Sequence, residues 1–407
     1  MKVAIVGGGA AGMMTAYLLN ALHNVTLFEK EPILGGNVRT INKNVTNVGL
    51  ENGIVIDNGV IEFATNQFPT FVKMMESLQI ELTPFEGNTA FYLQNGKYYL
   101  GPNLIKKEVK GFLKKSKECW KLLTLYPELH QLEKKIKQKQ NDLSLYTMKE
   151  FLREGDMYSW LRSLIMYAHS VKYPTINEDY PAEMGISILK SFGIGTKWST
   201  IQSGIYTYME KIVNLFKGKI FLNSQISEVS RNDLRISIRL QDGSVLDFEK
   251  VIFATPPEQV LKLLKDPTEN ETKRFAAWKT NQITTFIHTD RSIYNPYPIK
   301  YYSEFDIFET TKGDYGYNAY MNRISNIKLF TPYFMAYNME NVVDSRKIAH
   351  KQIHHTPLYT LDAMKYRQEI IETNGENNTY FVGAYLYNGL HEGAALSAKV
   401  VAPKFMS

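Results

Sequence analysis

The sequence of 407 residues contains a single cysteine, Cys119. One cysteine cannot form a disulfide within the chain, and it excludes both a CxxC redox pair and a zinc site built from cysteines. No apolar run reaches the roughly 18 residues that a membrane-spanning helix requires. The short apolar stretch after Met1 ends in three glycines, which differ from the helical core of a signal peptide. These absences predict a reducing, cytoplasmic location.

Negative charge is scarce in one segment, so positive charge is concentrated there. The whole chain carries 47 Lys and Arg against 41 Asp and Glu, a net charge of +6. Residues 105–140 alone hold 11 Lys and 4 Glu, a segment charge of +7, so the rest sums to about −1. A uniformly basic protein favours nucleic acid, whereas one basic segment indicates a local surface. We therefore expect no nucleic-acid partner.

The N-terminal residues predict a β-α-β unit. Residues 2–6 read as a short buried strand, residues 10–22 have helical spacing, and residues 25–29 read as a second strand. A glycine-rich turn lies between the first strand and the helix. This order of strand, glycine turn, helix and strand is typical of a Rossmann-like dinucleotide-binding domain.

The glycine turn has the GxGxxG pattern at Gly7, Gly9 and Gly12. Glycines there permit the tight turn, let the backbone approach a pyrophosphate and let helix and strand pack closely. Free N–H groups at the start of the helix then bind phosphate. Glu29 lies 22 residues after Gly7, at the end of the second strand, where a carboxylate accepts from ribose hydroxyls. The candidate residues of this unit are Gly7, Gly9, Ala10, Ala11, Gly12, Glu29 and Lys30.

A second glycine pair, Gly35 and Gly36, follows the acid and is succeeded by Asn37. It lets a second stretch of backbone approach the pyrophosphate side of the cofactor. Because of its position it resembles the GG motif of FAD-dependent amine oxidases and their relatives. The resemblance implies FAD, which GxGxxG alone does not distinguish from NAD.

This resemblance to the FAD-dependent amine oxidase superfamily extends over most of the chain. In that family a strand like residues 225–229 lends backbone groups to the adenine. Gly383 and residues 389–394 resemble the C-terminal FAD motif, in which a helix N-terminus directs its dipole at the flavin. The cofactor-binding residues that the resemblance adds are Ile226, Gly383, Leu390, His391, Glu392 and Ala394.

The resemblance implies an α/β fold. It consists of a Rossmann-like FAD-binding domain of the GR2 type and a substrate domain with a mixed β-sheet and helices. The FAD-binding segments are expected at residues 1–90, 201–265 and 376–407. A hairpin with a helical substrate or lid segment is expected at 91–200, and the substrate-domain sheet at 266–375. No second GxGxxG follows, so reduced flavin is expected to pass electrons to oxygen, to another protein or back to the substrate.

Two positions depart from the amine oxidase pattern. Many amine oxidases place a lysine near flavin N5, but the corresponding residues 282–289 contain none, and Thr284 is the expected equivalent. The aromatic residue that normally lies just before Glu-Gly-Ala is replaced by Leu390, which has no π face to attract an amine. Both departures favour an apolar substrate. Within the superfamily, the sequence is similar to bacterial FAD/NAD-binding proteins linked to modified fatty acids and to flavin-dependent fatty acid isomerases.

The candidate catalytic residues are His391, Tyr385 and Leu390. His391 adjoins the flavin motif, where it serves either in proton transfer or as a structural hydrogen-bond donor. Tyr385 either lines the pocket or packs in the core. No metal site is expected, because the histidines near residue 354 lack a carboxylate at ligand spacing.

Residues 105–123 combine apolar residues near one helical face with lysines over the rest. One interpretation is a helix that lies on an anionic membrane. The other is a helix that faces the core and exposes its lysines to water. The apolar residues are Ile105, Val109, Phe112, Leu113, Trp120 and Leu123.

Taken together, the sequence predicts an FAD-dependent oxidoreductase or isomerase. It is expected to abstract hydride from a C–H bond of a small, apolar, lipid-like substrate such as an unsaturated fatty acyl group. An amine or amino-acid oxidase that releases hydrogen peroxide is the alternative. A flavin-bearing binding protein without turnover is a third hypothesis, from a different class.

Overall fold

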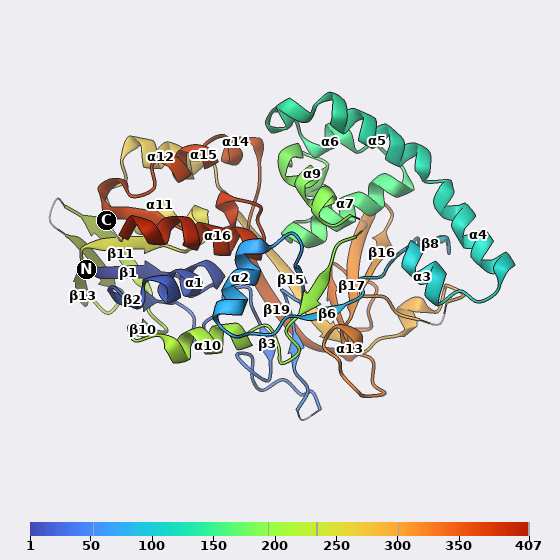
Figure 1. The fold of residues 1–407 in the computed structure, drawn as a ribbon, viewed down its shortest axis with the longest axis horizontal. Helices are drawn as coiled ribbons and strands as arrows, with labels where there is room; N and C mark the ends of the chain where they lie inside the picture. The colour runs from blue at the N-terminus through green and yellow to red at the C-terminus, as the bar shows by residue number, and fades with distance from the viewer. Residues whose placement is uncertain (52, 194, 233–234, 300, 406–407) are drawn as a thin grey trace.

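The computed structural model describes residues 1–51, 53–193, 195–232, 235–299, 301–405. A nucleotide-binding part and a substrate part lie at opposite ends of the long axis (Figure 1). The N-terminus and the C-terminal helix both belong to the nucleotide-binding part, so that part is built from both ends of the chain.

A five-stranded parallel sheet forms the centre of the nucleotide-binding part. Apart from the edge strand β10, which is partly exposed, its strands are short apolar runs that are buried on both faces, as is usual for parallel sheets. Three separated stretches of chain supply them, as the resemblance implies, although the expected segment boundaries stay a prediction. In spatial order they are β10 (Lys219–Phe221), β2 (Asn24–Phe28), β1 (Lys2–Val6), β14 (Lys250–Phe253) and β20 (Thr379–Phe381).

Alternate residues of β1 pack against different layers. Val3 and Ile5 share a core with the helices on one face, whereas Ala4 and Val6 share a core with a three-stranded antiparallel sheet on the other. The helices are α1 (Ala10–Leu19), α2 (Pro69–Ser77), α10 (Thr207–Leu215) and α16 (His391–Val401). The small sheet consists of β11 (Ile226–Arg231), β12 (Ile236–Leu240) and β13 (Val245–Phe248).

A seven-stranded mixed sheet forms the substrate part. Its pairs are antiparallel except β7 with β16, which run parallel. In spatial order the strands are β19 (Ile348–Pro357), β15 (Thr280–His288), β18 (Phe334–Tyr337), β17 (Asp314–Tyr320), β16 (Phe305–Thr311), β7 (Thr89–Tyr92) and β8 (Tyr98–Leu100).

Helices from the middle of the chain cover one side and the outer edge of this sheet (Figure 1). α7 packs on β17 and forms a wall between the sheet and the outer helices. The helices are α3 (Pro102–Lys107), α4 (Phe112–Leu123), α5 (Tyr126–Gln138), α6 (Met148–Phe151), α7 (Asp156–His169), α8 (Tyr173–Ile176) and α9 (Ala182–Ser191). Among the described residues, no helix has both the length and the apolar character to cross a membrane.

Smaller elements join the two parts. Two short sheets lie at the junction, made of β3 (Thr40–Ile41) with β4 (Ile56–Asp57), and of β5 (Phe63–Ala64), β9 (Trp198–Thr200) and β6 (Thr83–Phe85). The remaining helices are α11 (Val260–Leu263), α12 (Glu269–Ala276), α13 (Met321–Ile324), α14 (Leu361–Lys365) and α15 (Arg367–Glu372). The expected α/β class, with a Rossmann-like domain beside a mixed sheet and helices, is confirmed.

Candidate active site

The two glycine motifs of the N-terminal segment are in direct contact. The Gly35 N–H donates to the Gly8 carbonyl at 2.9 Å. A Cβ placed on Gly36 would lie 3.0 Å from the Gly9 Cα, and one on Gly7 would lie 2.8 Å from the Ala254 carbonyl oxygen. Gly7 and Gly36 also have φ values of +110° and +56°, which favour glycine. The result is a cradle of bare backbone that fits a pyrophosphate.

Gly12 has a different role from the other glycines of the pattern. A Cβ on Gly12 would lie 2.0 Å from the Gly7 carbonyl oxygen, inside the contact between α1 and the turn. Gly12 does not line the cavity described below. It therefore permits close packing of helix and strand, and it makes no direct contact with a ligand in that cavity.

Glu29 lies beside the cradle at the end of β2. Its carboxylate accepts hydrogen bonds from the Gly8 N–H at 2.7 Å and from the Glu31 N–H at 2.9 Å. A carboxylate has about four acceptor positions, so two protein donors leave room for ribose hydroxyls. Glu29 thus holds the glycine loop and remains available to a nucleotide.

A cavity of about 1070 Å³ runs from the glycine cradle to the substrate sheet. Nearly all the residues expected at the cofactor line it, which brings together segments that are far apart in the chain. These residues are Gly7, Gly9, Ala10, Ala11, Glu29, Lys30, Gly35, Gly36, Asn37, Ile226, Gly383, Leu390, His391 and Ala394, and the candidate catalytic residue Tyr385 also lines the cavity.

Glu392 and Gly12 are the two predicted cofactor-binding residues that do not line the cavity. Its carboxylate accepts from the Thr70 N–H at 3.0 Å and the Phe71 N–H at 2.9 Å, at the start of α2. Glu392 is buried and does not line the cavity. The structure therefore places it as a cap on the N-terminus of α2, where negative charge is favoured.

The N-terminus of α16 opens onto the cavity. Leu390 precedes the helix, and Leu390, His391 and Ala394 all line the cavity wall. The Asn388 side-chain oxygen accepts from the N–H groups of Leu390 and Gly393 at 3.1 and 2.9 Å, which fixes the turn before the helix. The positive end of the helix dipole is thus directed at the cavity, where it stabilises negative charge on a bound group.

The contacts of the His391 ring hold α16 in place. Its Nε2 lies 3.1 Å from the Tyr208 hydroxyl, and its ring packs edgewise on Phe63 and Phe71. Burial lowers the pKa of His391 to about 4, so the imidazole is neutral at pH 7. Tyr385 packs on Trp278 with ring centroids 5.2 Å apart, and burial raises the pKa of its phenol.

Glu62 also lines the cavity, although it is not among the predicted site residues. It lies directly before β5, and its Oε1 accepts from the Tyr167 hydroxyl of α7 at 2.5 Å. Burial raises the pKa of Glu62 to about 8, and the Asp57 carboxyl nearby adds to this effect. Its Oε2 is buried without a partner among the described residues. A glutamate within the apolar run 60–64 was a usable signal in the sequence.

Two further buried histidines line the same cavity. His169 Nε2 lies 2.8 Å from the Asn388 carbonyl oxygen, and burial lowers its pKa to about 4. His354 Nε2 lies 2.8 Å from the Thr285 hydroxyl, and burial lowers its pKa to about 3. Both rings are neutral at pH 7, so neither adds a positive charge to the cavity.

The register of β15 corrects one expectation. Thr284 does not line the cavity, whereas its neighbours Ile283 and Thr285 do. Side chains alternate between the faces of a strand, so a shift of one residue changes the face. Within the described lining, the one lysine is Lys30, which adjoins Glu29 at the nucleotide end.

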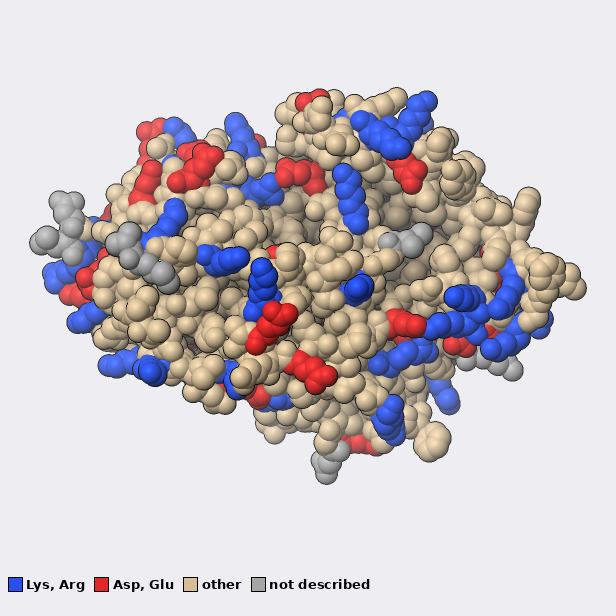
Figure 2. Space-filling model, in the orientation of Figure 1, with Lys and Arg blue, Asp and Glu red and all other residues tan. Residues whose placement is uncertain are grey.

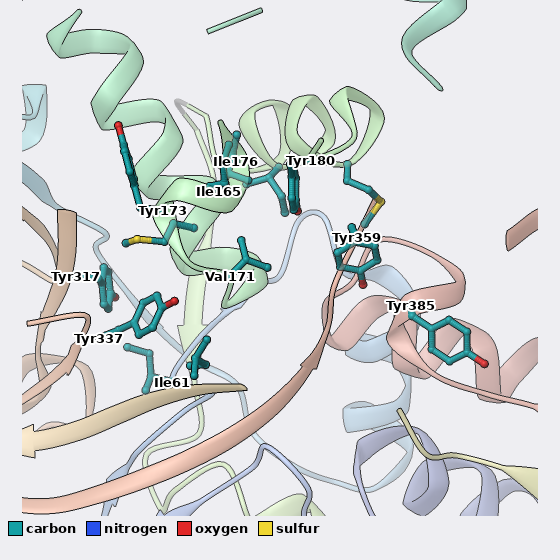
Figure 3. Close-up of a cluster of buried hydrophobic side chains, with 14 of the residues drawn as sticks. Ile61, Ile165, Val171, Tyr173, Ile176, Tyr180, Tyr317, Tyr337, Tyr359 and Tyr385 are labelled. Atoms are coloured by element: carbon teal, nitrogen blue, oxygen red, sulfur yellow. The ribbon is translucent and has the colours of Figure 1, made fainter. Parts of the chain in front are cut away.

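Aromatic and aliphatic side chains dominate the substrate end of the cavity. Figure 3 shows Tyr337 beside Ile61, and Tyr359 on the side toward Tyr385. The Tyr167 ring, which lines the cavity, stacks on the Tyr317 ring with centroids 3.6 Å apart. The lining residues of this end include Ile61, Glu62, Tyr167, Phe192, Trp198, Ile283, Met335, Tyr337 and Tyr359, and polar residues of the same elements, His169, Ser170, Gln282, Thr285, Gln352 and His354, also line the cavity.

Comparisons with known proteins agree with this geometry. Residues 5–78 match the family described as NAD(P)-binding Rossmann-like domain. No curated protein matches the chain. Among solved structures, it is similar to a CLA-producing fatty acid isomerase from P. acnes, with 15% identity, 100% of this chain and 98% of that chain covered, and a TM-score of 0.69.

Two oxidases are similar over the same length. Cyclohexylamine oxidase from Brevibacterium oxydans IH-35A has 12% identity, coverage of 100% of this chain and 99% of that chain, and a TM-score of 0.71. Putrescine oxidase bound to putrescine has 12% identity, the same coverage and a TM-score of 0.69. The chain therefore shares its fold with these two oxidases and with the fatty acid isomerase, which confirms the predicted fold class.

Proposed function

We propose that this protein is an FAD-dependent oxidoreductase or isomerase that removes hydride from a C–H bond of an apolar, lipid-like substrate, such as an unsaturated fatty acyl chain. The observation that carries the proposal is one continuous cavity. A backbone cradle suited to a dinucleotide forms one end, and a chamber of aromatic and aliphatic side chains forms the other. The fold shared with a fatty acid isomerase supports it.

The residues of the nucleotide end fit FAD. Gly7, Gly9 and Gly36 would approach its pyrophosphate, Glu29 would accept from its ribose, and the N-terminus of α16 would stabilise negative charge on its ring. When bound, FAD supplies a hydride acceptor. The chain's own contribution is to bind and orient the substrate and to exclude water from the chamber.

The electrostatics of the chamber favour an uncharged substrate. The raised pKa of Glu62, about 8, keeps its carboxyl protonated at pH 7. The lowered pKa values of His169 and His391, about 4, keep both rings neutral. Leu390 adds an aliphatic surface at the start of α16. A hydrocarbon chain can therefore bind beside Glu62, His169 and His391 without displacing water from a charged group.

One observation supports an amine substrate instead. The Oε2 of Glu62 is buried without a partner among the residues that the structure describes, and Glu62 lines the chamber. An ammonium group within about 4–6 Å would lower the pKa of this carboxyl and form a charge-assisted hydrogen bond with it. The fold shared with putrescine oxidase and cyclohexylamine oxidase supports this second candidate.

A panel of unsaturated fatty acids and a panel of amines, each mixed anaerobically with the flavin-loaded protein, separate the candidates. Flavin bleaching or double-bond movement with a fatty acid supports the lipid substrate. Bleaching with an amine alone supports the oxidase. A protein that binds FAD but responds to neither panel favours the binding protein without turnover.

We also propose that the protein is cytoplasmic and makes peripheral contact with a membrane. A cytoplasmic protein that acts on a lipid needs a route by which its substrate leaves a bilayer. The basic segment at residues 105–123 is the proposed peripheral contact, and it would leave the remainder of the protein in solution.

A further inference from the structure

The helix α4 has its amphipathic character reversed relative to a helix that packs on a core. Four of its apolar side chains face outward, because Phe112 and Leu113 are each 82% exposed, Trp120 is 70% exposed and Leu123 is 59% exposed, whereas Leu122 packs against the core. Its buried residue is instead a charged one, Glu118. The interpretation of residues 105–123 as a core-facing helix is therefore wrong for these four side chains, although it holds for Ile105, which is buried, and for Val109, which packs against the core.

Polar contacts hold α4 in this orientation. The Glu118 carboxylate accepts from the Tyr98 hydroxyl at 3.1 Å and from Lys121 Nζ at 2.9 Å. The same Lys121 Nζ lies 3.6 Å from the centroid of the Tyr98 ring. The hydrogen bond to Tyr98 of β8 and the ion pair with Lys121 thus provide partners for Glu118 on the inward face of α4. The four exposed apolar side chains lie on the outward face.

The outward side chains form one stripe. At 100° per residue, Phe112, Leu113, Trp120 and Leu123 fall within an arc of about 100°. Lys114 and Lys117 lie along one flank of this arc, and Lys115 lies along the other. We call the four apolar residues and their flanking lysines the α4 face.

The charge around the α4 face is strongly positive. Residues 105–123 contain seven Lys and two Glu, and one of these acids, Glu118, is buried in an ion pair. Figure 2 shows Lys and Arg gathered over α3 and the adjoining end of α4. An apolar stripe with basic flanks complements an anionic lipid surface, where lysines meet headgroups and rings enter the interface.

We propose that the α4 face docks this protein on membranes that contain anionic phospholipid. The proposal rests on the proposed function, which includes a membrane contact at residues 105–123. It assigns that contact to one face of α4 and to lipids with negatively charged headgroups. A second copy of the chain is a less suitable partner for the α4 face than an anionic membrane. A two-fold contact would set the lysine flanks of two α4 faces against each other, and like charges repel.

The test is co-sedimentation of the full-length, FAD-loaded protein with phosphatidylcholine vesicles, with and without phosphatidylglycerol. We expect at least about tenfold tighter binding to the anionic vesicles, and its loss at high salt. The double variant Phe112→Ser/Trp120→Ser removes apolar contact, and Lys114→Gln/Lys117→Gln removes charge. Each should weaken binding about tenfold or more. The control Leu22→Ser alters a 60% exposed leucine in the nucleotide-binding part and should change nothing.

A second readout uses Cys119, the single cysteine, which is exposed on α4. An environment-sensitive dye on Cys119 should report transfer to an apolar medium when anionic vesicles are added. Equal binding by the wild type and both double variants would overturn the proposal. If the Phe112→Ser/Trp120→Ser variant has half the mass of the wild type in solution and binds vesicles as the wild type does, the α4 face is instead a contact between two copies of the chain. Neither measurement involves turnover, so failure here is distinct from failure of the proposed function.

Discussion

The Glu62 carboxyl and the Tyr167 hydroxyl form a 2.5 Å hydrogen bond across the wall of the substrate chamber. The bond joins the segment before β5, next to the nucleotide-binding part, to α7 of the substrate part. It uses one carboxyl oxygen and leaves the other buried without a partner within the described part of the chain. We therefore expect a protonated Glu62 to favour a hydrocarbon in the chamber and an ionised Glu62 to favour a cation.

Glu62→Gln distinguishes the two substrate classes. The amide cannot ionise, so an ammonium substrate would lose its charged partner, and kcat/KM for an amine should fall about tenfold or more. Binding of an unsaturated fatty acid should change by less than about threefold, because the neutral carboxyl and the amide are similar in polarity. Steady-state kinetics with both substrates make the comparison. The exposed Glu154→Gln is the matched control. An unchanged amine kcat/KM in Glu62→Gln would remove the support for the amine candidate.

Glu62 also predicts a pH dependence of stability. Its pKa is raised from 4.5 to about 8 in the folded protein, so between these values the unfolded chain has released a proton that the folded protein retains. Stability should therefore fall as the pH rises from 4.5 toward 8, by a few kcal/mol at most. Urea unfolding at several pH values measures this, and Glu62→Gln should flatten the decline. The same slope in the variant and the wild type would contradict the assignment.

The buried histidines predict that the free energy of unfolding falls as the pH is lowered below 6.5. The pKa values of His169 and His391 are lowered from 6.5 to about 4 by burial. Between 4 and 6.5 the unfolded chain binds protons that the folded protein does not, so stability should fall as the pH drops through this window. His391→Gln should reduce the loss between pH 6.5 and 4 in urea unfolding curves. An unreduced loss would show that His391 is already charged in the folded protein.

The glycine cradle predicts loss of FAD without loss of fold. A Cβ on Gly9 would lie 3.8 Å from the Gly36 Cα, an ordinary contact, so Gly9→Ala should fold normally. The added methyl would occupy the space into which a pyrophosphate must fit, and FAD affinity should fall about tenfold or more. The flavin-to-protein absorbance ratio measures this. Gly49→Ala, which meets nothing within 4 Å, should keep its FAD.

Glu392→Ala should affect stability and not the cofactor. It removes the acceptor of two backbone N–H groups at the start of α2, which costs about 1–2 kcal/mol of unfolding free energy. Denaturant unfolding and FAD content, measured on one preparation, test both expectations. Lost FAD with unchanged stability would restore Glu392 as a cofactor ligand.

The sequence allowed prediction of the nucleotide-binding part because its signals are local. Gly7, Gly9 and Gly12 lie within six residues, and backbone geometry alone explains them. Glu62 was missed because its partner, Tyr167, is 105 residues away and only the tertiary fold brings them together. Thr284 was misplaced because a one-residue change of register reverses the face of a strand.

The orientation of α4 was equally beyond a local pattern. Periodicity identifies an apolar stripe but does not say whether a core covers it. Here the Glu118 carboxylate accepts a hydrogen bond from Tyr98 on β8, and this tertiary contact leaves the apolar stripe on the outward side of the helix. Glu392 illustrates the same limit, since a family motif gave its position but not the α2 N–H groups that it contacts.

The most direct test of the central claim is anaerobic mixing of the FAD-loaded protein with unsaturated fatty acids, followed by flavin absorbance and by analysis of double-bond position in the recovered lipid. We predict bleaching that persists, for an oxidase, or a moved double bond with the flavin oxidised again at the end, for an isomerase. An oxidised flavin and unaltered lipid throughout, with rapid bleaching by an amine, would contradict the account.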